Sequence, residues 1–138
     1  MIHLFILSLF LMTNPPENSK LTLTITNIGS SEGFVLVLVF DQGKGFPDTP
    51  SKAYKFLKLP ITQGKASTTV EIPVGRYAIS AFHDHNGDGK MRTGAFGIPK
   101  DAYGFSNNAK GIFGPPAFGK AAFDIPMGGK ELDIKLIL

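Results

Sequence analysis

The residues best suited to chemistry lie in one short run, in which Asp84, Asn86 and Asp88 alternate with other residues and Gly89 follows. This spacing matches the first half of a calcium-binding loop, where oxygens at positions one, three and five converge on a hard cation and a glycine permits the sharp turn. The main-chain carbonyl of Lys90 would supply position seven. The spacing therefore predicts a Ca²⁺ site at this turn.

The second half of the calcium pattern is missing. Position nine is Arg92 and position twelve is Ala95, so the bidentate glutamate of a helix-flanked calcium loop is absent. Further ligands must come from elsewhere, and the nearest candidates in the sequence are Asp101, Asn107 and Asn108. A metal-free interpretation stays open, because Asn-Gly and Asp-Gly steps favour tight turns and their side chains bond the local backbone.

Two histidines, His83 and His85, flank Asp84 and would share one face of a continuing strand. Neutral imidazoles at this spacing, with a carboxylate as third ligand, would hold zinc or copper in a hydrolase-like enzyme. The alternative is that one imidazole packs at the strand end and the other is solvated. No catalytic motif supports an enzyme: residues 104–108 (GFSNN) lack the last glycine of a nucleophile elbow, and no zinc-protease or phosphate-loop spacing occurs.

The elements that must position these residues are strands. Period-two alternation and β-branched residues predict strands at residues 21–28, 34–40, 65–72, 75–82, 120–125 and 131–138, with a short one ending near Ile61 after one or two helical turns within residues 51–58. Residues 34–40 (FVLVLVF) are apolar on both faces, as in a central strand covered on both sides. About seven strands and no long amphipathic helix predict an all-β antiparallel sandwich, immunoglobulin-like or transthyretin (prealbumin)-like.

One segment does not fit the strand pattern. Residues 83–119 are rich in Gly, Pro and Asn and lack periodicity, yet they carry five aromatic residues. Long loops in small domains are usually functional or disordered, and the aromatics argue against disorder because they have apolar surface to bury. We therefore expect a folded excursion over one end of the sandwich.

The amino terminus has the pattern of an export signal. Residues 1–12 are almost wholly apolar, and Thr13, Asn14, Pro15 and Pro16 follow. A run of this length is typical of a secretory signal peptide and is shorter than the roughly 20 residues of a membrane span. We expect a leader at residues 1–16, either cleaved or kept as an anchor, one domain at residues 17–138, and a periplasmic or extracellular location, with no other transmembrane segment.

Composition narrows the chemistry further. The chain of 138 residues has no cysteine, which excludes disulfides, thiolate metal sites and thiol nucleophiles. Its 14 basic and 11 acidic residues are dispersed along the sequence and form no basic stripe of the kind that nucleic acids require.

Several segments together resemble a known bacterial family. The runs LTLTITNI, GFVLVLVFD, AFHDHNGDGKM, YGFSNNAKG and GPPAF are similar to the family catalogued as domain of unknown function 2141, and the resemblance covers nearly the whole chain after the expected leader. Arg92 departs from the acidic residue often found there in similar proteins, which puts full metal coordination in doubt. The resemblance implies an exported β-sandwich without an established activity. Residues 73–77 (PVGRY) also resemble the P-x-G-x-Y element of transthyretin-like accessory modules.

These observations lead to one expected function and two alternatives. We expect a small exported binding or accessory protein that holds an unidentified ligand or cell-envelope partner through residues 84–118, with Ca²⁺ ordering the turn. The alternatives are a zinc- or copper-dependent hydrolase built on the histidines and a cell-surface structural module.

Overall fold

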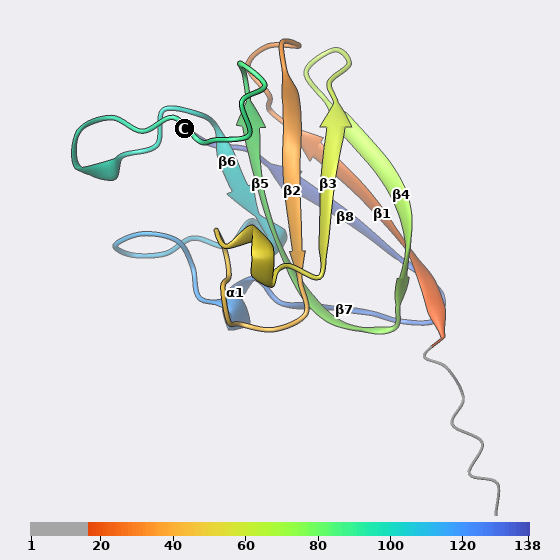
Figure 1. Ribbon diagram of the computed structural model, residues 1–138. Coiled ribbons are helices and arrows are strands. Elements are labelled where there is room, and N and C mark those ends of the chain that lie inside the picture. Colours follow the sequence, from red (N-terminus) through yellow and green to blue (C-terminus); the bar gives the residue numbers. More distant parts are fainter. Residues whose placement is uncertain (1–16) are drawn as a thin grey trace, which may run out of the picture.

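A computed structural model describes residues 17–138, and the leader expected at residues 1–16 lies outside them. The chain forms two packed sheets, one with the order β4-β1-β8 and the other with the order β3-β2-β5-β6, and β7 also pairs with β5 (Figure 1). The strands are β1 (Asn18–Thr26), β2 (Phe34–Phe40), β3 (Lys55–Pro60), β4 (Ala66–Pro73), β5 (Gly75–Asp84), β6 (Tyr103–Phe105), β7 (Phe123–Ile125) and β8 (Lys130–Lys135). The prediction of an all-β sandwich is confirmed, and its likeness to immunoglobulin or transthyretin domains stays a prediction.

The main core lies between the two sheets. Alternation along each strand turns one set of apolar side chains inward, since successive residues of a strand point to opposite faces. The fully buried members include Leu21, Leu23 and Ile25 of β1, Val35, Val37 and Val39 of β2, Ile79 of β5 and Ile134 of β8. The predicted strands at residues 34–40 and 75–82 therefore occupy the centre of the fold.

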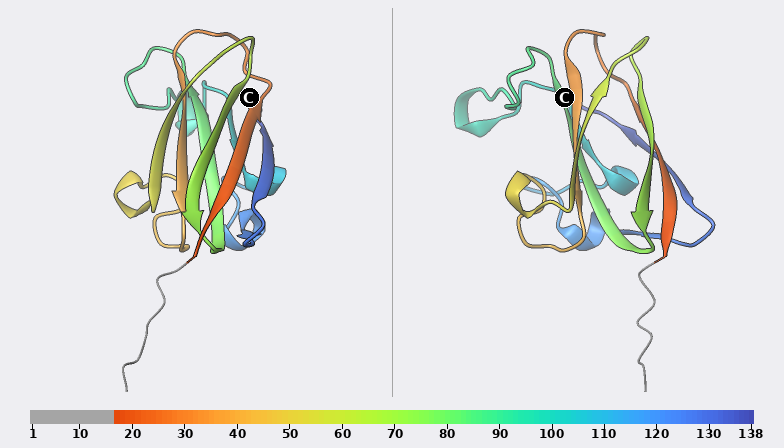
Figure 2. Two further views of the ribbon diagram at one scale, coloured as in Figure 1. Left: turned by 90° about the vertical axis from the view of Figure 1, so that its right-hand side faces the viewer. Right: turned by 45° about the vertical axis from the view of Figure 1, so that its right-hand side comes forward.

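A smaller apolar cluster covers the outer face of the second sheet. Phe40 of β2 is fully buried there and packs edge-on against Phe46, with ring centroids 5.4 Å apart. Phe46 in turn packs against Phe118, with ring centroids 5.9 Å apart. The covering segments include residues 41–54, which lie on the side of this sheet away from β1 and β4 (Figure 2), and Ala109, Phe118 and Ala121 of the excursion. The prediction that residues 34–40 are covered on both faces is confirmed.

Local details differ from the expectation in three places. The strands β1 and β8 pair in parallel, with Leu23 opposite Leu132, whereas every other strand pair is antiparallel. The helical turns expected within residues 51–58 shrink to a 3₁₀ turn, η1 (Pro50–Lys52), because β3 already begins at Lys55 and pairs with β2. The strand expected at residues 120–125 is preceded by a short helix, α1 (Phe118–Ala121), and shortens to β7.

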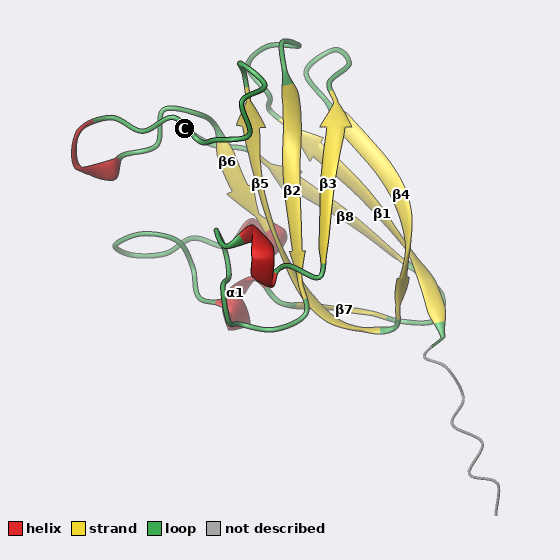
Figure 3. Cartoon of the chain, in the orientation of Figure 1, coloured by secondary structure: helices red, strands yellow, loops and turns green. Residues whose placement is uncertain are grey.

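The long excursion is anchored in the sheet and does not lie over one end alone. Its middle forms β6, which pairs with residues 80–82 of β5. Loops before and after β6 leave opposite ends of this short strand and contain two 3₁₀ turns, η2 (Ala95–Gly97) and η3 (Ser106–Asn108) (Figure 3). The excursion therefore crosses the sandwich from one end toward the other. Within residues 17–138 no helix is long and apolar enough to cross a membrane.

Candidate functional site

The acidic turn begins at the last residue of a central strand. Asp84 ends β5 and stands opposite Phe34 of β2, so the ladder of hydrogen bonds fixes its backbone. Its side chain is only 1% exposed. One carboxylate oxygen, Oδ2, accepts a hydrogen bond from the backbone N–H of Gly89 at 2.8 Å. A buried carboxylate at a rigid strand end is therefore aimed into the turn that follows.

The other two predicted ligands meet Asp84 in this turn. The side-chain amide of Asn86 lies 3.0 Å from Asp88 Oδ1 and 3.2 Å from Asp84 Oδ1. With Nδ2 toward the carboxylates the amide donates to both, whereas with Oδ1 toward them three oxygens face one another. Asp88 Oδ1 also accepts from the backbone N–H of Lys90 at 2.9 Å. The side chains at positions one, three and five of the predicted loop are thus gathered at one point.

The backbone of the turn depends on glycine. Gly87 and Gly89 have φ angles of 73° and 79°, in the left-handed region that side chains disfavour. These two residues let the chain reverse within five positions, which brings Asp88 back toward Asp84. The local sequence thus explains why the acidic side chains converge.

This geometry suits a hard cation better than it suits catalysis. Carboxylate and amide oxygens are the ligands that Ca²⁺ takes, and two carboxylates facing one amide form a small negative cluster. The arrangement contains no nucleophile beside a base, as covalent catalysis would require. Among the described residues, no group of three His, Asp or Glu side chains could hold a metal ion, so any site here depends on the amide of Asn86 and on main-chain oxygens such as that of Lys90.

Asp101 and Arg92 close the loop that follows the turn. The carboxylate of Asp101 accepts hydrogen bonds from the Arg92 backbone N–H at 2.7 Å and from Nε at 2.8 Å, and its Oδ1 forms an ion pair with Nη2 at 2.7 Å. Burial of Asp101, which is 3% exposed, opposes its ionisation, but the hydrogen bonds and charge of Arg92, aided by His83, outweigh that effect and lower the pKa of Asp101. The same carboxylate raises the pKa of Arg92. Asp101 is thus committed to Arg92, and it balances the cation that the sequence places beside Asp88.

Asn107 and Asn108 lie away from the acidic turn. Since β6 is antiparallel to β5, the chain moves away from Asp84 as it passes from Tyr103 to Asn107. Asn107 Nδ2 donates to the carbonyl oxygens of Lys120 and Ala122, at 3.2 and 2.8 Å. Asn108 Oδ1 accepts from the backbone N–H of Lys135 at 3.0 Å. The structure therefore does not bring these two candidate ligands to Asp84, and both stabilise the second loop instead.

The two histidines stand together, as the sequence predicts, and both bind Glu32. Their ring centroids are 5.7 Å apart. His83, which is buried, donates through Nε2 to the Glu32 carbonyl at 2.7 Å, and His85 Nε2 lies 2.7 Å from Glu32 Oε2. Since a carbonyl oxygen only accepts, Nε2 of His83 carries the proton, and zinc or copper would have to displace this bond to bind there.

The Glu32 turn fits against the acidic turn because of one glycine. Gly33 has a φ of 75°, and a Cβ at this position would overlap the carbonyl oxygens of Asp84 and His85. The turn between β1 and β2 therefore buttresses the end of β5. The contacts of Glu32 with the histidines and of Arg92 with Asp101 could not be predicted from the sequence, because their spacing matches no motif. The sequence indicates only that the two neighbouring histidines need hydrogen-bond partners.

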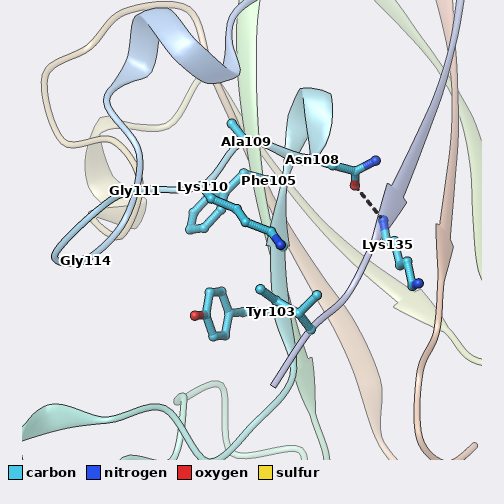
Figure 4. Close-up of a pocket in the computed structure, with 10 residues that line it drawn as sticks. Tyr103, Phe105, Asn108, Ala109, Lys110, Gly111, Gly114 and Lys135 are labelled. Atoms are coloured by element: carbon cyan, nitrogen blue, oxygen red, sulfur yellow. Dashed lines mark hydrogen bonds between the residues drawn. The ribbon is translucent and has the colours of Figure 1, made fainter.

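A separate cavity of about 330 Å³ lies beside β6. Figure 4 shows the rings of Tyr103 and Phe105 along it, with the side chain of Lys110 beside Phe105 and Lys135 on the neighbouring strand to the right. Ser106, which follows Phe105 in the chain, is fully buried. Its hydroxyl accepts from the Ile79 N–H and donates to the Ala121 carbonyl, so it serves the fold and is no exposed nucleophile. The cavity could receive a flat or anionic group but contains no reactive pair.

The protein is a two-sheet β-sandwich in which the side chains of Asp84, Asn86 and Asp88 meet in one turn. The long excursion that follows is held by the Arg92–Asp101 contacts and by the hydrogen bonds of Asn107. A family model described as an uncharacterized protein conserved in bacteria (DUF2141) matches residues 23–135, and the chain belongs to this family. The resemblance seen in the sequence is confirmed. Comparisons with curated proteins and with solved structures find no match.

Proposed function

We propose that the protein is an exported binding module, in which residues 84–118 form the binding surface and a hard cation such as Ca²⁺ orders the turn at its start. The observation that carries the proposal is the meeting of Asp84, Asn86 and Asp88 at the rigid end of β5, with amide-to-carboxylate distances of 3.0 and 3.2 Å. The apolar leader expected at residues 1–16 supports export to the periplasm or the cell exterior.

The cation would stabilise the conformation of the turn at the start of the excursion. Asp84 is almost fully buried and needs a positive or donating neighbour, because an uncompensated buried charge is costly. In the free turn the amide of Asn86 meets this need, and in the loaded turn its oxygen would rotate inward while the cation neutralises both carboxylates. Arg92 does not compete for Asp88, since Asp101 holds it in two side-chain contacts.

The expected affinity is modest. Calcium sites of weak extracellular modules have dissociation constants of about 0.1–1 mM, and two carboxylates place this turn in that group. At about 2 mM Ca²⁺ the cation would stabilise the fold by roughly 0.7–1.8 kcal/mol. A binding module outside the cell would thus be partly or largely loaded.

Thermal unfolding in chelator and in Ca²⁺ tests the proposal. We expect the wild-type melting temperature to rise by roughly 3–7 °C in about 2 mM Ca²⁺. The isosteric variants Asp84→Asn and Asp88→Asn should lose this increment, while Asp124→Asn, which changes an exposed acid on β7, should keep it. A wild-type melt that is the same in both solutions would contradict the cation site. Stoichiometric zinc or copper in the purified protein would instead favour the histidine site.

A further inference from the structure

Two loop tips in the excursion expose their apolar side chains completely. Phe96 and Phe113 are each 101% exposed, and the neighbouring Ile98 and Ile112 are 62% and 84% exposed. The two tips, residues 94–98 and residues 111–115, project from the same side of the sandwich (Figure 1). Isolated exposed apolar residues are common in proteins, but two paired sets on projecting loops mark an interaction surface.

The first tip is held in place by its base. Residues 92–100 form a narrow hairpin in which Gly94 N–H donates to the Ile98 carbonyl at 2.7 Å and Lys100 N–H donates to the Arg92 carbonyl at 2.8 Å. The Arg92–Asp101 contacts close the hairpin below. The tip is thus presented outward by an ordered support.

The second tip has a comparable support. Asn107 ties its base to residues 120–122, and Ser106 bonds the Ala121 carbonyl. At the neck the chain crosses itself so closely that a Cβ on Gly111 would overlap the carbonyl oxygens of Gly114 and Pro115. Ile112 and Phe113, which lie between these residues, therefore point into solvent.

The conformation of Phe96 is not explained by folding. Its φ of 58° lies in the left-handed region, which costs a bulky residue about 1 kcal/mol or more. Its side chain has no packing that offsets this cost, because it is fully exposed. An asparagine or glycine would adopt this backbone more easily, so neither backbone preference nor packing within the protein accounts for a phenylalanine at this position.

Charge identifies the kind of surface that fits. Between Gly89 and Phe123 the chain has five basic residues and one acidic residue, Asp101, which is already paired, whereas the rest of the chain carries one net negative charge. Lys100 follows Ile98 by two residues and Lys110 precedes Ile112 by two. Each apolar tip therefore has a basic residue two positions away in the sequence, and residues 89–123 carry a formal net charge of +4. The side chain of Lys110 itself extends along the rings of Phe105 and Tyr103 (Figure 4).

We propose that the two tips dock on a lipid bilayer containing anionic phospholipids, with the apolar residues entering the interface and the net positive charge of residues 89–123 attracting the headgroups. An interface of this kind accepts apolar side chains at any spacing and attracts the flanking cations. A second copy of the chain fits less well, since it would bring two surfaces of +4 together. The inference rests on the proposed function in one respect, that residues 84–118 form the binding surface, and it does not require Ca²⁺.

The chain has no tryptophan, so single tryptophans report each position. The variants Phe96→Trp and Phe113→Trp are mixed with vesicles of phosphatidylcholine containing roughly one-third phosphatidylglycerol, and with pure phosphatidylcholine vesicles. Met127→Trp is the matched control, because Met127 is 70% exposed in the turn between β7 and β8, on the side away from the tips. We expect the fluorescence emission of both tip variants to shift to the blue on anionic vesicles only, and that of the control to stay unchanged. Binding to vesicles through the apolar leader alone would leave the tip tryptophans in water and would give no such shift.

Cosedimentation completes the test. The double variant Phe96→Ser with Phe113→Ser should bind the anionic vesicles at least about tenfold more weakly than Met127→Ser does, and binding of the latter should fall as salt rises. Tip tryptophans that do not shift on anionic vesicles overturn the docking proposal, even where Ca²⁺ stabilises the protein. A shift confined to the tips in chelator supports docking even where the calcium experiment fails, so the two proposals fail separately.

Discussion

Replacing Asp101 by Asn should loosen the clamp that closes the first loop. The carboxylate accepts two hydrogen bonds from Arg92, at 2.7 and 2.8 Å, and makes an ion-pair contact with Nη2 at 2.7 Å. A neutral amide has only one oxygen to offer and would turn its NH₂ group toward the remaining donors. Because Asp101 is 3% exposed, water does not replace the contacts on its side, whereas the half-exposed guanidinium of Arg92 can be solvated. The expected cost at neutral pH is about 1–3 kcal/mol of unfolding free energy, or roughly 4–12 °C in melting temperature.

The dependence of this cost on pH distinguishes the ion pair from simple packing. Folding lowers the pKa of Asp101 below its ordinary value of 3.8, so the carboxylate stabilises the folded state fully above that value and loses the contribution as pH falls through the lower folded pKa. Urea unfolding of wild type and variant should therefore differ by a constant amount down to about pH 5, and the difference should shrink as the pH falls below 3.8 and through the lower folded pKa. Asp124→Asn should show no difference. A difference for Asp101→Asn that is the same at all pH values would refute the ion-pair account.

Three further changes test the supports of the site by thermal unfolding. Gly33→Ala should destabilise by roughly 3 kcal/mol, because its Cβ would overlap the carbonyl of Asp84 at a positive φ; a melt like wild type would show that the turn is not packed there. Ser106→Ala should cost about 1–3 kcal/mol, since the buried N–H of Ile79 loses its acceptor at 2.8 Å, whereas Ser106→Thr tests whether the hydroxyl alone suffices. Tyr77→Phe should cost about 0.5–1.5 kcal/mol by removing a 2.7 Å bond to the carbonyl four residues earlier, and unchanged stability would contradict that bond.

The strands could be predicted where the apolar residues of the strand itself indicate which of its faces are buried. In residues 34–40 both faces are apolar, and both are indeed covered, by the opposite sheet and by the cluster around Phe46. β6 could not be predicted, because three residues with Gly104 at the centre show no periodicity. It forms because the edge of β5 is free at residues 80–82, and Gly104 is needed since a Cβ would lie 2.9 Å from Ile134.

Pairing between distant strands leaves no local signal. The parallel contact of β1 with β8 joins Leu23 to Leu132, and alternation in either strand is the same for a parallel or an antiparallel partner. The same limit applies to the site. Spacing alone predicts that Asp84, Asn86 and Asp88 converge, whereas the assignment of Asp101 to Arg92 requires the folded loop.

The positive charge of the excursion has no motif of its own. Its five basic residues stand singly among uncharged ones, and the excess appears only when residues 89–123 are counted apart from the rest of the chain. Likewise, aromatic residues in the excursion divide into two kinds. Phe105 and Phe118 pack in the smaller cluster, as expected of a folded excursion, while Phe96 and Phe113 face solvent.

The most direct test of the acidic turn follows the side-chain amide of Asn86 by ¹⁵N NMR during a Ca²⁺ titration. The account predicts that its NH₂ signals shift as the amide oxygen turns toward the cation, together with the backbone N–H of Gly89 and Lys90, which bond Asp84 and Asp88. These signals should saturate with one midpoint at about 0.1–1 mM. Signals of Asn86 that stay fixed to about ten times that concentration would contradict the cation site.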